Sequence, residues 1–518
     1  MDMPTLLPGL PDRWNADDTA IIGPDGSGIT YGDLSCRVED LAALLSAAGF
    51  GPGQRVAVLQ SKRIDAVVSI LALLRVGAAY VPLSPRWPML RLRQSLVTCG
   101  IGAVLVHPQD SRHLAWLGDE SGFRLLDVTD AEAAASDAGS VRRRAPEGGD
   151  IAYMICTSGT SGTPKAVMIR RESLAAFLDA VVQCSGYDRS MRWLSVAPLH
   201  FDASTLDFLP LAAGGTLVLL DRAMLPGDVL RPMAQHRITD TMLISSLLRA
   251  AVGRHADLAA YDLSNLRTLW YGGESCPTAV LRAFAAAHPH VRFRHGYGPS
   301  ETCNTATLFD FEGVPADAPD YMPIGKPLAT VEAYALDENR VPVGPGSTGE
   351  LWIGGIQVMA GYCGDPARSA AVLVPNFMNP ESPYPLYRTG DKVAVDDDGN
   401  FVYLGRDDDL VKTRGHLVSL IEIQTALLDA LPIADAIIVT TPDPVAGNRL
   451  DAFLVSNRAS VDKATAVQAL RRTLPPQMIP DAFHHLAPED VPRRDTGKVD
   501  LKALQALAAE RRLAASIA

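Results

Sequence analysis

The stretch TSGTSGTPK (157–165) lies between two apolar segments, IAYMIC (151–156) and AVMI (166–169), which we expect to form strands. Glycines in such a loop let the backbone turn its N–H groups inward as a nest for an anion, and a lysine adds positive charge. The residues that could hold phosphate oxygens in this way are Thr157, Ser158, Gly159, Thr160, Ser161, Gly162 and Lys165. Composition alone predicts a solvated hairpin loop equally well.

The spacing within this stretch argues against a Walker-type nucleotide loop. That motif reads GxxxxGK[ST] and opens directly into a helix. Here Gly159, Gly162 and Lys165 have a different spacing, and a short strand is expected to follow. A P-loop NTPase is therefore a poor match.

The sequence on either side of the loop predicts an α/β protein. Short apolar runs such as RVAVLQ (55–60) alternate with helical patterns such as DAVVSILALLRVG (65–77), which is typical of stacked βα layers. Residues 131–150 lose this periodicity and are expected to form a surface connection. From about residue 325 consecutive strands are expected, and we anticipate a small β-barrel there.

The polar segment GRDDDLVKTRG (405–415) is expected to join two domains. It separates a large N-terminal domain, residues 1–407, from a small α+β domain, residues 408–518. The pattern of the small domain is strand, strand, helix, strand, strand, helix. We expect the boundary near Asp408.

Bulk composition excludes several classes of protein. The chain has 518 residues, a net charge of -12, 47% hydrophobic and 20% charged residues, which fits a globular protein and disfavours a nucleic-acid-binding surface. Its seven cysteines are scattered and form no CxxC pair, so neither a disulfide framework nor a zinc ribbon is expected. Neither a signal peptide nor a membrane span is visible. We therefore expect a cytoplasmic protein that binds neither nucleic acid nor membrane.

Together with the loop, nine further motifs in collinear order resemble the adenylate-forming superfamily, which includes acyl-CoA synthetases, luciferases and the adenylation domains of non-ribosomal peptide synthetases. The resemblance covers nearly the whole chain. The motifs are ITYGDL (29–34), LLRVGAAYVPLSP (73–85), FDAS (201–204), YGGE (271–274), GYGPSET (296–302), GELWIGG (349–355), YRTGD (387–391), GRDDDLVKTRG (405–415) and DTGKVD (495–500).

The resemblance implies a reaction in which a carboxylate and ATP give an acyl-adenylate and pyrophosphate, followed by thioester formation. Loop 157–165 would then hold the β- and γ-phosphates, and Glu301 would coordinate Mg²⁺, a cation that prefers carboxylate and phosphate oxygens. The remaining ATP- or AMP-binding residues that the resemblance implies are Gly272, Gly273, Glu274, Tyr297, Asp391 and Arg406.

Two further residues would act at the reacting atoms. In the family a lysine at the position of Lys498 enters the site and bridges the substrate carboxylate and the α-phosphate, which provides positioning and electrostatic stabilisation. Thr302 would reach the α-phosphate. The small domain that carries Lys498 is expected to rotate about a hinge at Asp408, since hinges are often a few element-terminal residues.

Asp202, in FDAS, indicates which acid is activated. Amino-acid-activating members of the family keep an aspartate here to pair with the substrate ammonium, and a buried carboxylate is costly without a cationic partner. A simpler interpretation is a helix N-cap, because DASTLDFL (202–209) could start a helix.

The side-chain pocket that the alignment implies is uncharged, which favours a small neutral amino acid similar to alanine or valine; a β-amino acid is an alternative. Its lining would comprise Ala203, Leu206, Met242, Trp270, Gly272, Gly296, Asn304 and Thr305.

The resemblance implies an enzyme of natural-product biosynthesis that transfers its product to the phosphopantetheine thiol of a carrier protein. Because no LGG-x-S carrier motif follows Lys498 in this sequence, we expect the enzyme to be freestanding and the carrier to be a separate protein. Two alternatives stay open at this point. One is a CoA ligase of the same superfamily, and the other is a catalytically inactive nucleotide-binding protein, which the presence of Lys165, Glu301, Asp391 and Lys498 disfavours.

Overall fold

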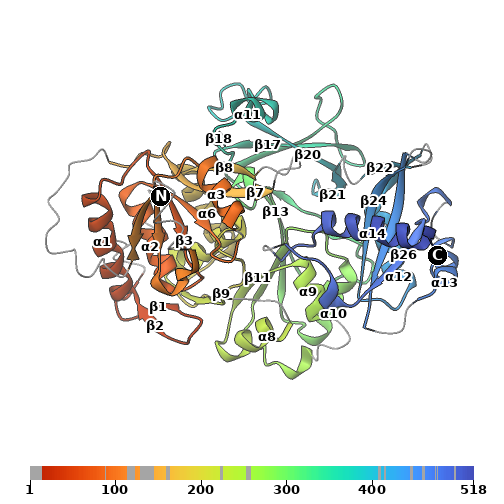
Figure 1. The fold of residues 1–518 in the computed structure, drawn as a ribbon, viewed down its shortest axis with the longest axis horizontal. Coiled ribbons are helices and arrows are strands. Elements are labelled where there is room, and N and C mark those ends of the chain that lie inside the picture. The colour runs from red at the N-terminus through yellow and green to blue at the C-terminus, as the bar shows by residue number, and fades with distance from the viewer. Residues whose placement is uncertain are drawn as a thin grey trace.

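The computed structural model has a large N-terminal domain of three sheets and a small C-terminal domain, which lie side by side (Figure 1). This confirms the predicted α/β class and the division into a large and a small domain. The structure describes residues 14–87, 89–113, 123–128, 145–158, 164–221, 226–252, 258–406, 410–413, 416–443, 447–457, 461–472, 474, 476–494 and 497–517. Asp408 and residues 159–163 of the phosphate-loop motif lie outside these ranges.

The largest sheet carries the strands that end at the candidate site. Its central strands β9 to β13 pair in parallel, and β14 closes one side antiparallel to β13. In spatial order the nine strands are β15 (Lys326–Pro327), β14 (Thr307–Glu312), β13 (Arg292–Tyr297), β12 (Thr268–Gly272), β11 (Asp240–Ile244), β9 (Arg192–Ser195), β10 (Thr216–Leu219), β1 (Thr19–Ile22) and β2 (Gly28–Thr30).

The second sheet contains the strands on both sides of the phosphate-loop motif. As expected, IAYMIC (151–156) and AVMI (166–169) lie in strands, which extend over 151–158 and 164–170 and pair antiparallel as a hairpin. In spatial order the seven strands are β18 (Gly361–Tyr362), β8 (Pro164–Arg170), β7 (Ile151–Ser158), β4 (Ala79–Leu83), β3 (Arg55–Leu59), β5 (Ala103–Val106) and β6 (Arg124–Asp127).

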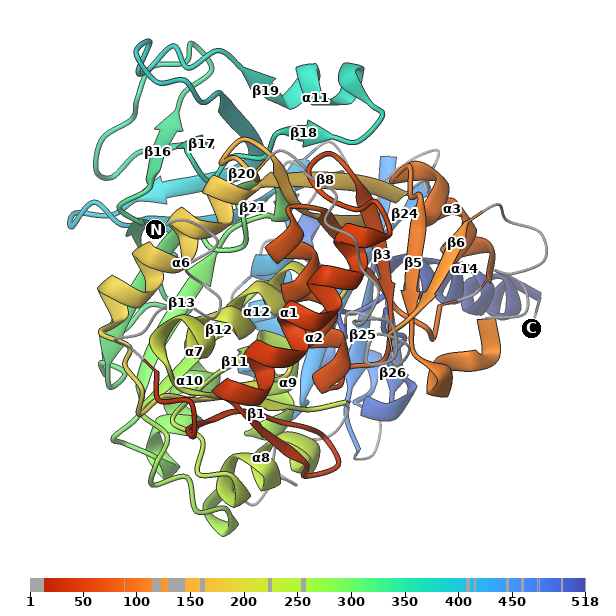
Figure 2. The same cartoon turned by 90° about the vertical axis from the view of Figure 1, so that its left-hand side faces the viewer.

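The two sheets share one apolar core that includes the helices α1 (Tyr31–Ala47), α2 (Ile64–Val76), α6 (Arg171–Ser185) and α7 (Phe208–Ala213). Figure 2 shows α1 and α2 running side by side across this face. Other helices cover the outer faces: α3 (Met89–Thr98) packs on the second sheet, and α8 (Pro226–Gln235), α9 (Ser245–Ala251) and α10 (Thr278–Ala287) pack on the first.

The third sheet occupies the place where a small β-barrel was expected. It pairs antiparallel in the order β16 (Val331–Leu336), β17 (Thr348–Gly355), β20 (Leu386–Val395) and β19 (Leu373–Val374), with β21 (Phe401–Arg406) added on β20. In the described part of the chain no pairing of β16 with β21 closes it, so this region is an open sheet. The short α11 (Pro366–Val372) precedes β19.

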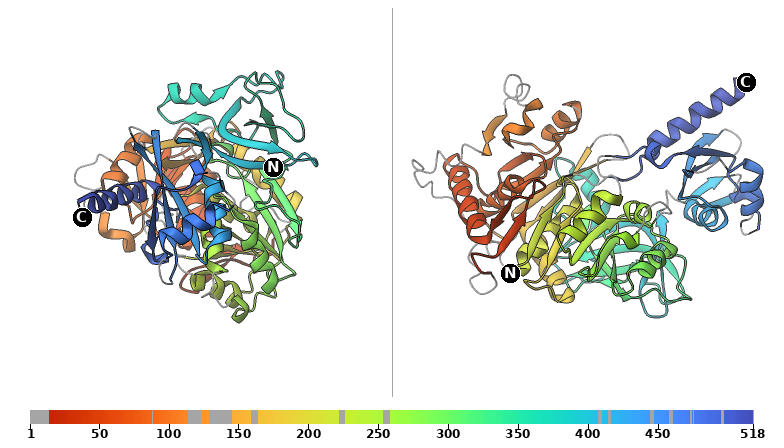
Figure 3. Two further views of the ribbon diagram at one scale, coloured as in Figure 1. Left: turned by 90° about the vertical axis from the view of Figure 1, so that its right-hand side faces the viewer. Right: turned by 90° about the horizontal axis from the view of Figure 1, so that it is seen from below.

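The small domain follows the predicted pattern and then extends it. The hairpin β22 (Leu410–Thr413) and β23 (His416–Ser419) leads to α12 (Leu420–Ala430), β24 (Asp435–Asp443), β25 (Gly447–Val455) and α13 (Lys463–Leu470). The sequence analysis missed β26 (Ala482–Leu486), which pairs parallel to β25, and the last helix α14 (Leu501–Ile517). Seen from below, α14 points away from the large domain, and its N-terminal end lies toward the junction (Figure 3).

Candidate active site

Two glycines at the ends of neighbouring parallel strands form the floor of the site. Gly272 on β12 and Gly296 on β13 are directly opposed. A Cβ atom on Gly272 would lie 2.2 Å from the carbonyl oxygen of Gly296, so the backbones approach too closely for any side chain there. The carboxyl ends of parallel strands are where ligands bind in open α/β sheets.

Lys165 lies beside Glu301, so the structure brings these two predicted site residues together. Its Nζ is 2.5 Å from Glu301 Oε1 and 4.8 Å from the centre of the Tyr362 ring. The hydroxyl of Tyr362 donates to the same Glu301 oxygen at 2.7 Å. The hairpin thus places the lysine of the phosphate-loop motif against a buried carboxylate from a different sheet.

A single carboxylate matches the way in which Mg²⁺ is held between one or two carboxylates and substrate phosphates. Among the described residues no group of three or more His, Cys, Asp or Glu side chains could hold a metal by itself. The donor set therefore fits Mg²⁺ that arrives with a nucleotide rather than an all-protein metal cage.

Tyr297, Asp391 and Arg406 also meet. The Tyr297 hydroxyl donates to Asp391, and Arg406 Nε lies 3.3 Å from the other carboxylate oxygen of that aspartate. Asp391 and Arg406 are paired residues on β20 and β21, which explains how two distant motifs converge. Burial and, to a smaller extent, the charge of Asp391 raise the pKa of Tyr297 well above its ordinary value. The phenol therefore stays protonated and can donate its hydrogen bond to Asp391.

Asp202 is buried in the first turn of the short 3-10 helix Asp202–Asp207. Phe201, and not Asp202, holds the N-cap position, so the helix-capping interpretation does not apply. Ser300, in the GYGPSET motif, donates its hydroxyl to the Asp202 carboxylate. Burial raises the pKa of Asp202, while the hydrogen bond from Ser300 and the charge of Lys498 act in the opposite direction.

Lys498 reaches the large domain from the small one. Its Nζ donates to the carbonyl oxygen of Gly273 at 2.9 Å and lies 5.1 Å from the centre of the Phe201 ring. The preceding Gly497 has a φ of +82°, and Arg494 N–H donates to the Lys498 carbonyl at 2.7 Å, so a tight turn presents the lysine.

The side chains of the predicted pocket lie on one sheet face and on the two segments that cover it. Met242 and Trp270 are directly paired on β11 and β12, while Gly272 and Gly296 follow two residues further along their rows. Asn304 and Thr305 are buried and joined by a 2.6 Å hydrogen bond between their side chains; Ala203 and Leu206 are buried on the 3-10 helix.

Three further predicted residues make contacts with neighbouring protein groups, and their roles toward ATP stay predictions. Within the described part of the chain, the Glu274 side chain has a buried Oε2 without a hydrogen-bond partner, and its carbonyl accepts from Ser245. The Thr302 hydroxyl donates to the carbonyl of Pro299 at 3.0 Å and thereby supports the GYGPSET turn. Arg406 donates to the carbonyl of Thr389 at 2.8 Å as well as approaching Asp391.

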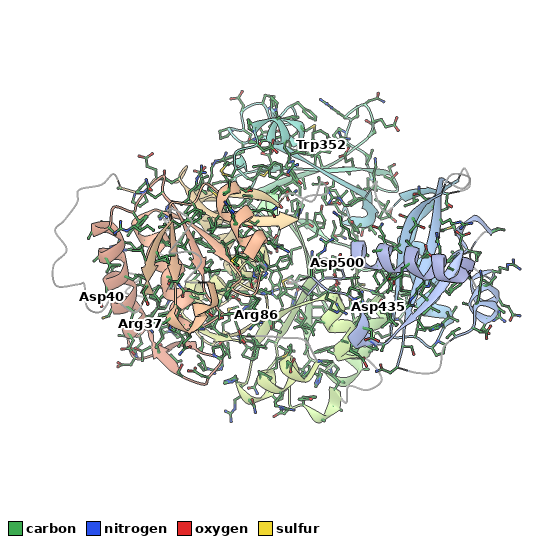
Figure 4. The ribbon with its side chains drawn as sticks, in the orientation of Figure 1. Arg37, Asp40, Arg86, Trp352, Asp435 and Asp500 are labelled. Atoms are coloured by element: carbon green, nitrogen blue, oxygen red, sulfur yellow. The ribbon has the colours of Figure 1, made fainter. Side chains whose placement is uncertain are left out.

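The sequence analysis missed an ion pair between the domains. Arg249 on α9 lies 3.3 Å from Asp435 at the start of β24, and the two side chains are 9% and 12% exposed. Close by, the hydroxyls of Tyr321 and Thr425 lie 2.8 Å apart. Figure 4 shows Asp435 at the side of the small domain that faces the large one, with Asp500 nearer the centre of the molecule. No motif signals such pairs, because their partners are far apart in the chain.

If Lys498 acts in adenylation, Asp435→Asn should lower the rate of that reaction at least fivefold. The pair is largely buried while the domains are in contact, so removing one charge leaves Arg249 without its counter-charge and favours separation of the domains by at least about 1 kcal/mol. The measurement is ATP–pyrophosphate exchange at saturating ATP. The matched control is Asp490→Asn, an exposed aspartate of the same domain; equal rates for the two variants would show that the ion pair does not hold Lys498 in place.

Comparison with known proteins identifies the family and agrees with the fold. The model of the AMP-binding enzyme family matches residues 11–363, and that of the AMP-binding enzyme C-terminal domain matches residues 422–498. The chain therefore belongs to the AMP-binding enzymes, which are adenylate-forming ligases. Among the described residues no helix is both long and apolar enough to cross a membrane.

Similar curated proteins are large synthases. Tyrocidine synthase 3 of Brevibacillus parabrevis is 32% identical over 94% of this chain, and isonitrile lipopeptide synthase of Streptomyces coeruleorubidus is 36% identical over 93%. The chain spans only 7% and 32% of their lengths. A solved four-domain nonribosomal peptide synthetase bound to AMP and glycine superposes with a TM-score of 0.78 at 27% identity, over 94% of this chain and 35% of that one.

Proposed function

We propose that this chain activates a small neutral amino acid with ATP, forming an aminoacyl-adenylate and pyrophosphate, and then transfers the aminoacyl group to the phosphopantetheine thiol of a carrier protein. The observation that carries this proposal is the buried Asp202 carboxylate, which shares the site with Lys498 and Ser300. A buried carboxylate requires a cationic partner, and the ammonium group of an amino acid supplies one.

The residues would divide the work as follows. The loop 157–165 and Lys165 bind the phosphates, and Glu301 holds Mg²⁺, which neutralises phosphate charge. Tyr297 lies against the adenine, and Asp391 with Arg406 binds the ribose hydroxyls. Asp202 binds the ammonium group, so that a substrate carboxylate oxygen faces the α-phosphorus; Lys498 stabilises the negative charge that develops as the P–O bond forms and pyrophosphate leaves.

The two domains would have separate roles in the two half-reactions. The large domain binds the substrates, and the small domain presents Lys498 for adenylation. We propose that the junction lies near Asp408 and that a rotation there presents a different face of the small domain for thioester formation.

The test is an ATP–pyrophosphate exchange assay with a panel of α- and β-amino acids in the presence of Mg²⁺. We expect strong exchange with alanine- or valine-like substrates, because none of the predicted pocket residues carries a charge. Exchange with glutamate, lysine or arginine, and none with small neutral amino acids, would contradict the proposal. Comparison of CoA with a phosphopantetheinylated carrier protein as the acceptor then separates a carrier ligase from a CoA ligase.

A further inference from the structure

A row of four side chains crosses the sheet beneath the candidate amino-acid pocket. Met242, Trp270, Arg294 and Asp310 are directly paired, one on each of β11, β12, β13 and β14. Directly paired residues in a sheet present their side chains on the same face. The row therefore places a tryptophan, an arginine and an aspartate side by side immediately before the strand ends at Gly272 and Gly296.

Buried polar contacts fix the orientation of the Trp270 indole. The indole is fully buried, and its Nε1 donates to the Tyr187 hydroxyl at 2.7 Å. Tyr187 follows α6, directly after Gly186, which ends that helix in a left-handed conformation. The same hydroxyl accepts a hydrogen bond from Arg294 Nη1 at 3.0 Å. Burial raises the pKa of Tyr187, so the phenol stays neutral.

Arg294 joins the Tyr187 and Trp270 contacts into one network. Its guanidinium carbon lies 5.5 Å from the centre of the Trp270 ring and 5.4 Å from that of Tyr187. Its Nε donates to Asp310 at 3.1 Å, so the buried charge is paired. The indole is thus held at its N–H by Tyr187 and at its face by a guanidinium that is itself fixed.

The indole lies close to the bare Cα of Gly296. A Cβ atom on Gly296 would lie 3.5 Å from Trp270 Cε3 and 3.3 Å from Thr305 Oγ1. A methyl group attached to Gly296 would therefore touch the indole and crowd Thr305. The fully buried indole thus lies directly beneath a glycine that the resemblance places in the side-chain pocket.

We propose that Tyr187 and Arg294 are positioning residues that fix Trp270 as the far wall of the side-chain pocket and so restrict the substrate to amino acids with small side chains, such as alanine and valine. This inference rests on the proposed function and deepens it. Neither residue touches the substrate; both act through the indole. Without the Tyr187 hydroxyl, a buried N–H loses its partner, and the ring no longer has one favoured position.

The test is Tyr187→Phe, which removes the hydroxyl and keeps the ring. Exchange is measured with alanine and with leucine, and kcat and KM are determined separately. We expect the ratio of kcat/KM for alanine to that for leucine to fall about tenfold, chiefly through a lower KM for leucine. The kcat with alanine should change less than about threefold, because the reacting groups are untouched.

Two controls separate positioning from a general loss of structure. Tyr334→Phe removes a hydroxyl that contacts Glu332 at 3.4 Å in the third sheet, and this variant should keep the wild-type ratio. In a Trp270→Phe background the ring has no N–H to donate, so adding Tyr187→Phe should change the ratio little further. If Tyr187→Phe instead caused a general structural defect, it would change the alanine-to-leucine ratio as much in the Trp270→Phe variant as in the wild-type chain.

The outcomes distinguish this inference from the proposed function. If the wild-type chain exchanges no amino acid at all, the proposed function fails. If the wild-type chain exchanges alanine and Tyr187→Phe keeps the alanine-to-leucine ratio within twofold, the proposed function stands and the positioning role of Tyr187 is wrong.

Discussion

Replacing Lys498 with alanine should slow adenylation about 10²–10³-fold, the range measured when one preorganised donor is removed from a developing negative charge. Lys498 Nζ is already inside the site, 2.9 Å from the carbonyl oxygen of Gly273 and 5.1 Å from the Phe201 ring. Since the groups proposed to bind the substrates belong to the large domain, the loss should fall on kcat, while the affinity for ATP should change little.

The half-reactions must be measured separately to test this role of Lys498. Single-turnover adenylation should show the full loss, whereas transfer from chemically supplied aminoacyl-adenylate to the carrier should survive. The matched control is Lys502→Ala, an exposed lysine of the same domain, whose backbone N–H helps to form the cap of α14 and whose side chain can be removed without cost. Equal damage to both half-reactions by Lys498→Ala would exclude a role confined to adenylation.

Replacing Asp202 with alanine should nearly abolish amino-acid-dependent exchange. Removing one partner of a buried ion pair costs about 3–5 kcal/mol, which corresponds to a factor of roughly 10²–10⁴ in kcat/KM. The carboxylate is buried and accepts from Ser300, so its removal would leave the substrate ammonium group without its counter-charge. If the variant keeps the wild-type efficiency with its best amino acid, Asp202 does not bind the ammonium group.

Two further readouts make the role of Asp202 specific. The des-amino analogue of the best substrate lacks the ammonium group. Asp202→Ala should therefore reduce the difference in kcat/KM between the amino acid and this analogue. Because burial raises the pKa of Asp202, its carboxyl gains a proton at a higher pH than an ordinary aspartate does. The kcat/KM for the amino acid should therefore fall as the pH falls through this raised pKa, and Asp202→Asn should lose that acid limb.

The sequence predicted the local backbone elements on which several of the candidate site residues lie. The hairpin around Lys165, the strand ends at Gly272 and Gly296, and the turn that holds Glu301 are local motifs, and their backbone geometry follows from glycine and strand patterns. The predicted pairing of Asp202 with an ammonium group stays a prediction, although its burial fits that role.

Contacts between distant segments could not be predicted from one sequence. Tyr362 beside Glu301, and Arg249 beside Asp435, depend on how sheets and domains pack, and neither residue carries a local pattern. Burial of Arg294 behind Trp270 was missed for a similar reason: an arginine in a strand gives no sign of its partners on the next strand and on a loop after α6. The open third sheet also differs from the expected barrel, because closure depends on which edge strands pair.

The large domain has a continuous core of its own, which holds the proposed substrate-binding groups together independently of the small domain that carries Lys498. One apolar cluster joins the helices and strands of the first two sheets and extends into the third, whereas the small domain has apolar clusters of its own. The groups proposed to bind nucleotide and amino acid thus stay assembled whatever the small domain does, and Lys498 arrives from outside. If the small domain rotates as proposed, the mixed anhydride would form only while Lys498 is in contact with the large domain.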